Sequence, residues 1–191
     1  MKFSLPLLLT ILLLAASCTS DKSQSANISS AQKAADSTGI ERTVADNNFG
    51  IIDDFKTSAS TFQHDTFDLH DQSTDGGKLI RSNSNDKNYL VFDVWLFGET
   101  GKLHAIYWTD KQTNIRIVQW TDYKYDKPYY EPGFNSTSTT DFHSFVDNSY
   151  VRYDSSRNQV YDSSNLESAN RVKRLFANVS NEIADNHAHR K

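Results

Sequence analysis

The fold of this chain is decided by the stretch YLVFDVWLFGETGKLHAIYWTDKQTNIRIVQWTDYKY, residues 89–125. Three runs within it, at 89–97, 103–109 and 115–125, are dense in Val, Ile, Trp, Tyr and Phe, the residue types that favour strands. Short segments with Gly, Asp and Asn separate the runs, as they do in hairpins. The stretch therefore predicts a three-stranded antiparallel meander.

Weaker strand patterns flank the meander on both sides. They lie at 65–70, 78–83, 149–154 and 159–162. The segment 126–135, with Pro128, Pro132 and Gly133, predicts turn structure at the end of the meander. At 141–146, Phe142, Phe145 and Val146 favour a short helical turn.

The hydrophobic period changes from two to that of a helix between residues 164 and 184. The apolar residues that fall on one stripe at helical spacing are Leu166, Ala169, Val172, Leu175, Phe176, Val179 and Ile183. Such a stripe is expected to pack on a sheet. The sequence therefore predicts an α+β fold, an antiparallel β-meander sheet or open barrel with a C-terminal amphipathic helix packed on it.

The chain opens with the features of an export signal. Lys2 precedes an apolar run from Leu5 to Ala16, and small residues follow. A run of about a dozen residues is too short for a transmembrane helix, which needs about 20. We therefore interpret residues 1–17 as a signal peptide that is removed from the mature chain.

The segment Leu14-Ala15-Ala16-Ser17-Cys18 resembles the lipobox of bacterial lipoproteins. The resemblance implies cleavage before Cys18 and acylation of its thiol and amine, so that lipid anchors the chain in the cell envelope. With Thr19 as the next residue, the resemblance implies delivery to the outer membrane. An ordinary signal peptidase would cut the same bond and leave Cys18 as a free thiol. Cys18 is the only cysteine, so we expect neither an intrachain disulfide nor a disulfide-linked partner.

Composition divides the mature chain into a tether and one domain. Residues 18–48 are rich in Ser, Ala, Asp and Asn, and a flexible segment of this length reaches roughly 30 Å from its anchor. Residues 49–185 are expected to form a single β-rich globular domain, and 186–191 a frayed tail. The formal net charge of −4 argues against nucleic acid as a partner, and the basic cluster at 171–174 is interpreted as the solvated face of the helix.

The chain carries few signs of catalytic or metal chemistry. It contains no Gly-x-Ser-x-Gly elbow, no His-Glu-x-x-His motif and no calcium loop. His64 and His70 would lie about 20 Å apart along one strand, too far to share a metal ion. We therefore expect no metal and no cofactor, and we expect a binding protein in preference to an enzyme.

The lengths of the two hairpin loops predict which residues share a face of the meander. With loops at 98–101 and 110–114, paired positions sum to 199 across the first turn and 224 across the second. An aliphatic core face then contains Phe92, Val94, Leu96, Leu103, Ala105, Tyr107, Ile115 and Ile117. The opposite face collects Trp95, Trp108, Trp120, Asp93, His104 and Arg116. This set is a candidate binding face for a protein or a glycan, unless a second layer covers it and the tryptophans are core.

Residues 73–131 also resemble domains of uncharacterised bacterial lipoproteins. The resemblance rests on Ser73-Thr74-Asp75-Gly76-Gly77, on Gly98-Glu99-Thr100-Gly101-Lys102 and on Tyr125-x-x-Pro128-x-Tyr130. It implies the envelope location and no particular activity. The expected function is a non-catalytic, lipid-anchored binding module for an envelope protein or glycan. The alternative is an envelope hydrolase or isomerase that works with His and Asp residues brought together by the fold, and convergence of His104, Asp93 or Asp68 within about 3 Å of one another in a cleft would favour it.

Substitution of the anchor residue tests the predicted address. Cys18→Ala is expected to move the protein from the membrane fraction to the soluble fraction, because stable attachment requires the acyl chains that Cys18 would carry. Immunoblots of both fractions measure the shift, with Thr19→Ala as the control. Unchanged fractionation of Cys18→Ala would exclude lipid anchoring through this residue.

Overall fold

A computed structural model of the chain describes residues 47–146 and 149–188. The signal peptide, Cys18 and the tether up to residue 46 lie outside the described residues. In the described ranges, no helix is both long and apolar enough to cross a bilayer.

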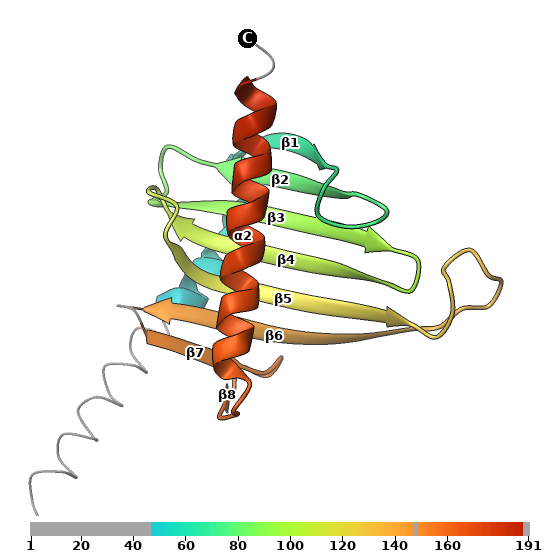
Figure 1. The fold of residues 1–191 in the computed structure, drawn as a ribbon. Helices are drawn as coiled ribbons and strands as arrows, with labels where there is room; N and C mark the ends of the chain where they lie inside the picture. Colours follow the sequence, from blue (N-terminus) through green and yellow to red (C-terminus); the bar gives the residue numbers. More distant parts are fainter. Residues whose placement is uncertain (1–46, 147–148, 189–191) are drawn as a thin grey trace, which may run out of the picture.

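The domain is built on one eight-stranded antiparallel sheet, in which the strands follow one another in sequence order (Figure 1). The strands are β1 (Gln63–Leu69), β2 (Gly77–Asn83), β3 (Tyr89–Gly98), β4 (Gly101–Asp110), β5 (Ile115–Tyr125), β6 (Ser136–Val146), β7 (Ser149–Tyr153) and β8 (Gln159–Val160). The sheet is open, with β1 and β8 at its edges. The predicted α+β fold with an antiparallel meander is confirmed.

The helical turn that we expected at 141–146 is wrong, because this segment is the second half of β6. Phe142 packs in the cluster beneath the N-terminal helix, whereas Phe145 packs against the cluster beneath the C-terminal helix. The apolar residues therefore alternate between the two faces of the sheet, which is the period of a strand and not of a helix.

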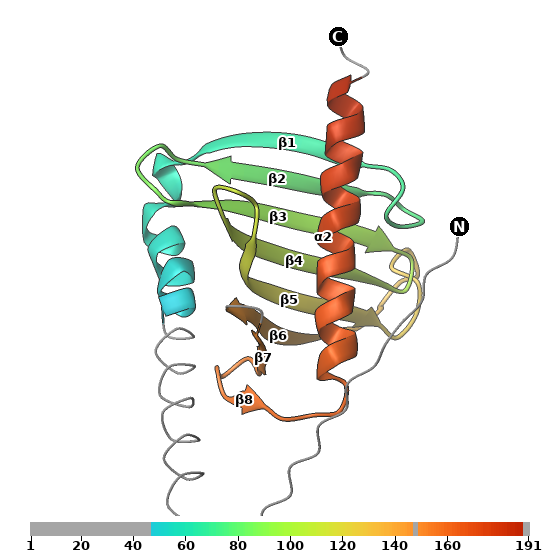
Figure 2. The same ribbon diagram turned by 60° about the vertical axis from the view of Figure 1, so that its left-hand side comes forward.

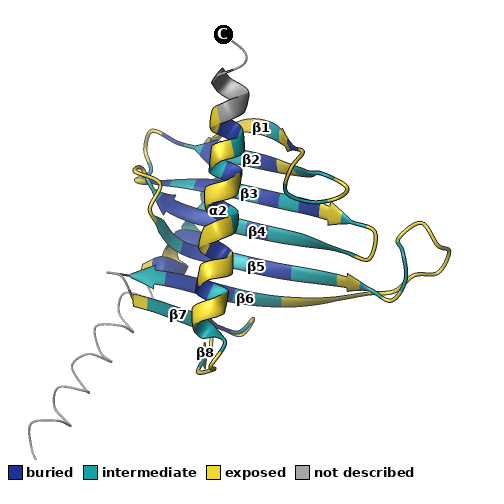
Figure 3. Cartoon of the chain, viewed as in Figure 1, coloured by how far each residue is buried: buried dark blue, intermediate teal, exposed yellow. Residues whose placement is uncertain are grey.

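The C-terminal helix α2 (Asn165–Ala188) lies across one face of the sheet (Figure 1). Five members of the predicted stripe are buried, namely Ala169, Val172, Phe176, Val179 and Ile183. The ring of Phe176 contacts those of Phe92 and Tyr107 at centroid distances of 5.2 and 4.9 Å. Figure 3 shows the exposed outer side of the helix in yellow. The helix therefore docks through the stripe, although Leu166 at its start is exposed.

A helix at residues 47–58, followed by the short helix η1 (Ala59–Thr61), covers part of the other face (Figure 2). Phe49 lies edge to face against Phe142 and Tyr153, with ring centroids 5.3 and 5.2 Å apart. Ile52 and Phe62 extend the same buried cluster. The sequence did not predict this N-terminal helix, and the expected domain boundary at residue 49 falls within it.

The first hairpin has the predicted register, but the second contains a bulge. Trp95 pairs with His104, as the sum of 199 requires. Thr109 pairs with Ile115, as the sum of 224 requires, but Trp108 pairs with Ile117. Arg116 is therefore an extra residue in β5, and beyond it every side chain of the strand lies on the face opposite to the predicted one.

Truncation of a buried ring on α2 tests whether the helix is docked. Phe176→Ala is expected to lower the free energy of unfolding by on the order of 3–5 kcal/mol, because it removes a buried aromatic side chain and leaves a cavity. Urea denaturation of the variant and the wild type measures the change. The exposed neighbour Arg174 is the control, and equal stability of Phe176→Ala and Arg174→Ala would show that the helix does not pack as described.

Candidate functional site

The predicted binding face is assembled only in part. Asp93, Trp95, His104 and Trp108 lie on the face opposite α2. Trp120 pairs with Ala105 and belongs to the cluster under α2, so the prediction that the three tryptophans share one face is wrong. The physical reason is the bulge at Arg116, which reverses the two faces of β5.

The remaining tryptophans of this set have their ring surfaces occupied by other side chains. Trp108 is 1% exposed and lies beneath the N-terminal helix, edge to face with Phe55. The Trp95 ring stacks on His104 at a centroid distance of 3.7 Å, and the Lys102 Nζ lies 4.8 Å from the Trp95 centroid. These neighbours take up π surface that a sugar ring or a partner would need.

His104 and Asp93 form a close pair on the same face. The His104 Nε2 lies 2.9 Å from the Asp93 Oδ1, and both side chains are partly exposed. Asp68 lies on β1, three strands from His104, which corresponds to about 14 Å across a sheet. The fold therefore brings His104 and Asp93 together, whereas Asp68 lies apart from both.

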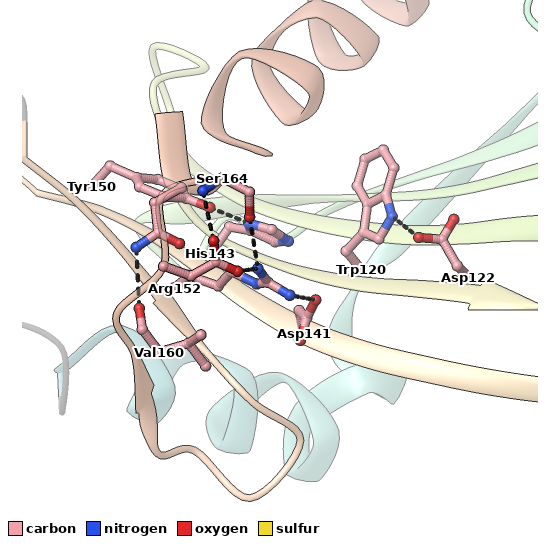
Figure 4. Close-up of polar contacts among 10 residues, drawn as sticks. Trp120, Asp122, Asp141, His143, Tyr150, Arg152, Val160 and Ser164 are labelled. Atoms are coloured by element: carbon pink, nitrogen blue, oxygen red, sulfur yellow. Dashed lines mark hydrogen bonds and ion pairs between the residues drawn. The ribbon is translucent and has the colours of Figure 1, made fainter. Parts of the chain in front are cut away.

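A pocket that sequence analysis missed lies between β5, β6, β7 and the start of α2 (Figure 4). Its volume is about 310 Å³. Its lining consists mainly of charged and hydroxyl-bearing side chains, and comprises Trp120, Asp122, Lys124, Thr139, Asp141, His143, Arg152, Ser164, Ser168, Arg171 and Val172. These residues are spread over 53 positions of the chain, and only the meander and α2 bring them together.

Both carboxylates of the pocket are engaged by the protein itself. Asp141 accepts a hydrogen bond of 2.8 Å from Arg152 (Figure 4). Asp122 accepts bonds from the Trp120 indole at 2.9 Å and from Arg171 at 3.0 Å. Arg171 also lies over the Trp120 ring, 4.6 Å from its centroid. Arg171 therefore contacts the pocket wall, whereas the sequence suggested only a solvated helix face.

His143 is the most buried ionisable side chain of the pocket, with 4% exposure. Its Nδ1 lies 2.7 Å from the Tyr150 hydroxyl, and Nε2 has no hydrogen-bond partner within the described part of the chain. Burial lowers the pKa of His143 to about 4, and the nearby cations Arg152 and Arg171 act in the same direction. The imidazole is therefore neutral at neutral pH.

The tautomer of His143 depends on the direction of its hydrogen bond with Tyr150. Burial raises the pKa of Tyr150 to about 12, and the nearby cation Arg152 partly opposes this rise. The phenol is neutral at neutral pH, so its proton can be donated to the Nδ1 of His143. In that tautomer the imidazole proton resides on Nε2, which is then a buried donor in the pocket wall.

Other unsatisfied polar atoms lie close to this donor. The Nε of Arg152 and the Oδ1 of Asn165 are also buried without a hydrogen-bond partner among the described residues. Buried polar atoms are paired in the great majority of cases. Three of the four unpaired buried side-chain atoms of the described residues lie at the junction of β6, β7 and α2, and the fourth is the Nε1 of Trp108 on the other face of the sheet. This clustering marks the junction as a candidate ligand site.

Comparisons of the chain with protein-family models, with curated proteins and with solved structures give no match. The geometry and electrostatics of the pocket are therefore the basis for assigning it a role.

The low pKa of His143 predicts a specific dependence of stability on pH. The unfolded chain binds a proton at His143 near pH 6.5 and the folded chain only near pH 4, so the free energy of unfolding falls as pH is lowered through this window. The expected loss is on the order of 2–3 kcal/mol. Urea titrations from pH 7 to pH 4 measure it, and His143→Gln is expected to show a flatter profile. Parallel profiles for the two proteins would contradict the assignment.

Proposed function

We propose that this chain is an exported, lipid-anchored protein of the cell envelope that works as a non-catalytic binding module, with the pocket at the start of α2 as its ligand site. The predicted signal peptide at 1–17, the lipobox-like position of Cys18 and the Ser- and Ala-rich composition of 18–48 support this location in the cell envelope. The class of ligand is a group from an envelope glycan or protein that is small enough to enter a pocket of about 310 Å³.

The single observation that carries this proposal is the buried Nε2 of His143. It lies in the wall of the pocket and has no hydrogen-bond partner in the described residues. An unpaired buried donor costs about 1–3 kcal/mol of stability. A ligand that accepts this hydrogen bond removes the cost, and the recovered free energy contributes to the affinity of the pocket for that ligand.

The chemistry of the pocket supports binding more directly than turnover. A general base works best when its pKa lies near the working pH. His143, with a pKa lowered to about 4 by burial, is a weak base. Asp122 and Asp141 are held by Arg171 and Arg152, which leaves these carboxylates committed to structural pairs.

The second candidate function is an envelope hydrolase or isomerase, and one observation favours it. The 2.9 Å contact between His104 and Asp93 is the arrangement in which a carboxylate orients an imidazole for proton transfer. Trp95, stacked on the imidazole at 3.7 Å, covers one face of that ring. This pair lies on the opposite side of the sheet from the pocket, so variants separate the two functions.

A pocket-filling variant tests the proposal. Ser168→Leu places a larger apolar side chain in the pocket, and Asn170→Leu places the same side chain on the exposed side of the same helical turn. We expect the mature chain with Cys18→Ala to bind members of a glycan or peptide array, Asn170→Leu to bind equally, and Ser168→Leu to bind at least about tenfold more weakly. Array fluorescence measures binding, and circular dichroism verifies folding.

Three outcomes count against the proposal. Absence of binding on both arrays would reject a small glycan or peptide group as the ligand. Binding that Ser168→Leu leaves unchanged would place the ligand elsewhere on the domain. Chemical conversion of an array member that His104→Ala abolishes would favour the enzyme.

A further inference from the structure

We propose that the pocket at the start of α2 recognises a carboxylate, and that its ligand is an acidic sugar of the uronic acid type. This inference rests on the proposed binding function and adds the chemical class of the ligand. It is argued from the hydrogen-bonding capacity, the charge and the size of the pocket.

Two buried donors of the pocket lining are unused, whereas its two carboxylates are in use. The Nε2 of His143 and the Nε of Arg152 are buried and have no partner in the described ranges. The carboxylates of Asp122 and Asp141 already accept from Arg171, Trp120 and Arg152. A ligand therefore gains most from presenting acceptor oxygens, and a carboxylate presents two on one carbon.

The charge of the lining matches a monoanion. Lys124, Arg152 and Arg171 face two carboxylates, so the lining carries one net positive charge with His143 neutral. The N-terminal end of α2 adds a partial positive charge from its helix dipole. Asp162, outside the lining, accepts from the Ser164 amide and from Arg152, and limits how much further negative charge is favoured. A carboxylate neutralises the net charge of the lining, whereas a dianionic phosphate would leave it negative.

The size and the hydroxyl groups of the pocket favour a sugar over a longer peptide segment. A volume of about 310 Å³ lies at the lower end of the range for small-molecule sites. Thr139, Ser164 and Ser168 line the pocket and can exchange hydrogen bonds with ring hydroxyls. Figure 4 shows Ser164 beside Arg152, on the side of the pocket away from Trp120.

Calorimetric titration of the mature chain with Cys18→Ala tests the inference. The probes are glucuronate and its neutral counterpart glucose, which differ only in the oxidation state of one carbon. We expect glucuronate to bind at least about tenfold more tightly, because charge-assisted hydrogen bonds to the carboxylate contribute about 1.5–3 kcal/mol. Inorganic phosphate and an acetylated dipeptide with a free carboxyl terminus are the remaining arms.

Two substitutions of His143 separate donation from packing. In His143→Gln the terminal amide nitrogen takes a position close to that of Nε2 and still donates, whereas His143→Met offers no donor. We expect His143→Gln to keep the preference for glucuronate and His143→Met to lose roughly tenfold or more of it. Circular dichroism shows whether each variant folds.

Nitrogen NMR of the wild-type imidazole gives a result that does not depend on the variants. Glucuronate should shift the Nε2 resonance of His143 and raise its pKa, because the ligand places an anion beside the ring. Glucose should do neither. Four results would each overturn the inference. Two concern the ligand: equal binding of the two sugars, or tighter binding of phosphate or of the dipeptide. Two concern the imidazole: an Nε2 resonance that glucuronate leaves unaffected, or unchanged selectivity in folded His143→Met. If the array shows binding to neutral sugars that Ser168→Leu abolishes, the proposed function stands and this inference fails.

Discussion

The side chain of Asn48 supports the irregularity on which the rest of the structure depends. Asn48 is 1% exposed at the start of the N-terminal helix, and its Nδ2 donates to the Arg116 carbonyl at 3.1 Å and to the Ser144 Oγ at 2.8 Å. The carbonyl of a bulged residue is displaced from the regular ladder, and a buried carbonyl needs a donor. Asn48 supplies that donor, so the N-terminal helix both covers the sheet and stabilises the change of register in β5.

That change of register determines what each face of β5 can do. Beyond Arg116, Ile117 joins the cluster beneath the N-terminal helix, and Trp120 joins the cluster beneath α2. Trp120 then packs beside His143, with ring centroids 6.2 Å apart and an interplanar angle of 76°, and its indole donates to Asp122. With an unbulged strand the indole would lie on the other side of the sheet, and the wall of the pocket would lack both the ring and its contact with Arg171. Because of this single extra residue, Trp120 lies in the wall of the pocket and not on the predicted binding face.

The sequence predicted those features that depend on local period and missed those that depend on distant neighbours. The meander strands and the α2 stripe are recognisable because their apolar residues recur at fixed spacing, so β5 has the predicted bounds of 115–125. The sequence did not predict β6, because its first six residues, Ser136 to Asp141, are all polar. The strand is stabilised by its hydrogen-bonded ladder to β5. The bulge could not be predicted because the side chain that donates to the Arg116 carbonyl, Asn48, is 68 residues away in the sequence. The pocket could not be predicted for the same reason, since no segment of the chain contains more than a few of its residues.

The unpaired buried atoms of the described residues are concentrated at one junction of the fold. Two exposed turns satisfy their polar groups closely: Asp110 and Asp154 each accept two backbone amides and an asparagine side chain within five-residue turns. A chain that satisfies exposed loops in this way would be expected to satisfy its interior as well, where an unpaired group costs more. Yet His143 and Arg152 retain unpaired nitrogens at the junction of β6, β7 and α2, where Asn165 also retains an unpaired oxygen. Away from this junction, the described residues contain one further unpaired buried side-chain atom, the Nε1 of Trp108 beneath the N-terminal helix. Local consistency is commonly broken at functional sites, and an interaction with a ligand is the physical compensation that this junction lacks within the described chain.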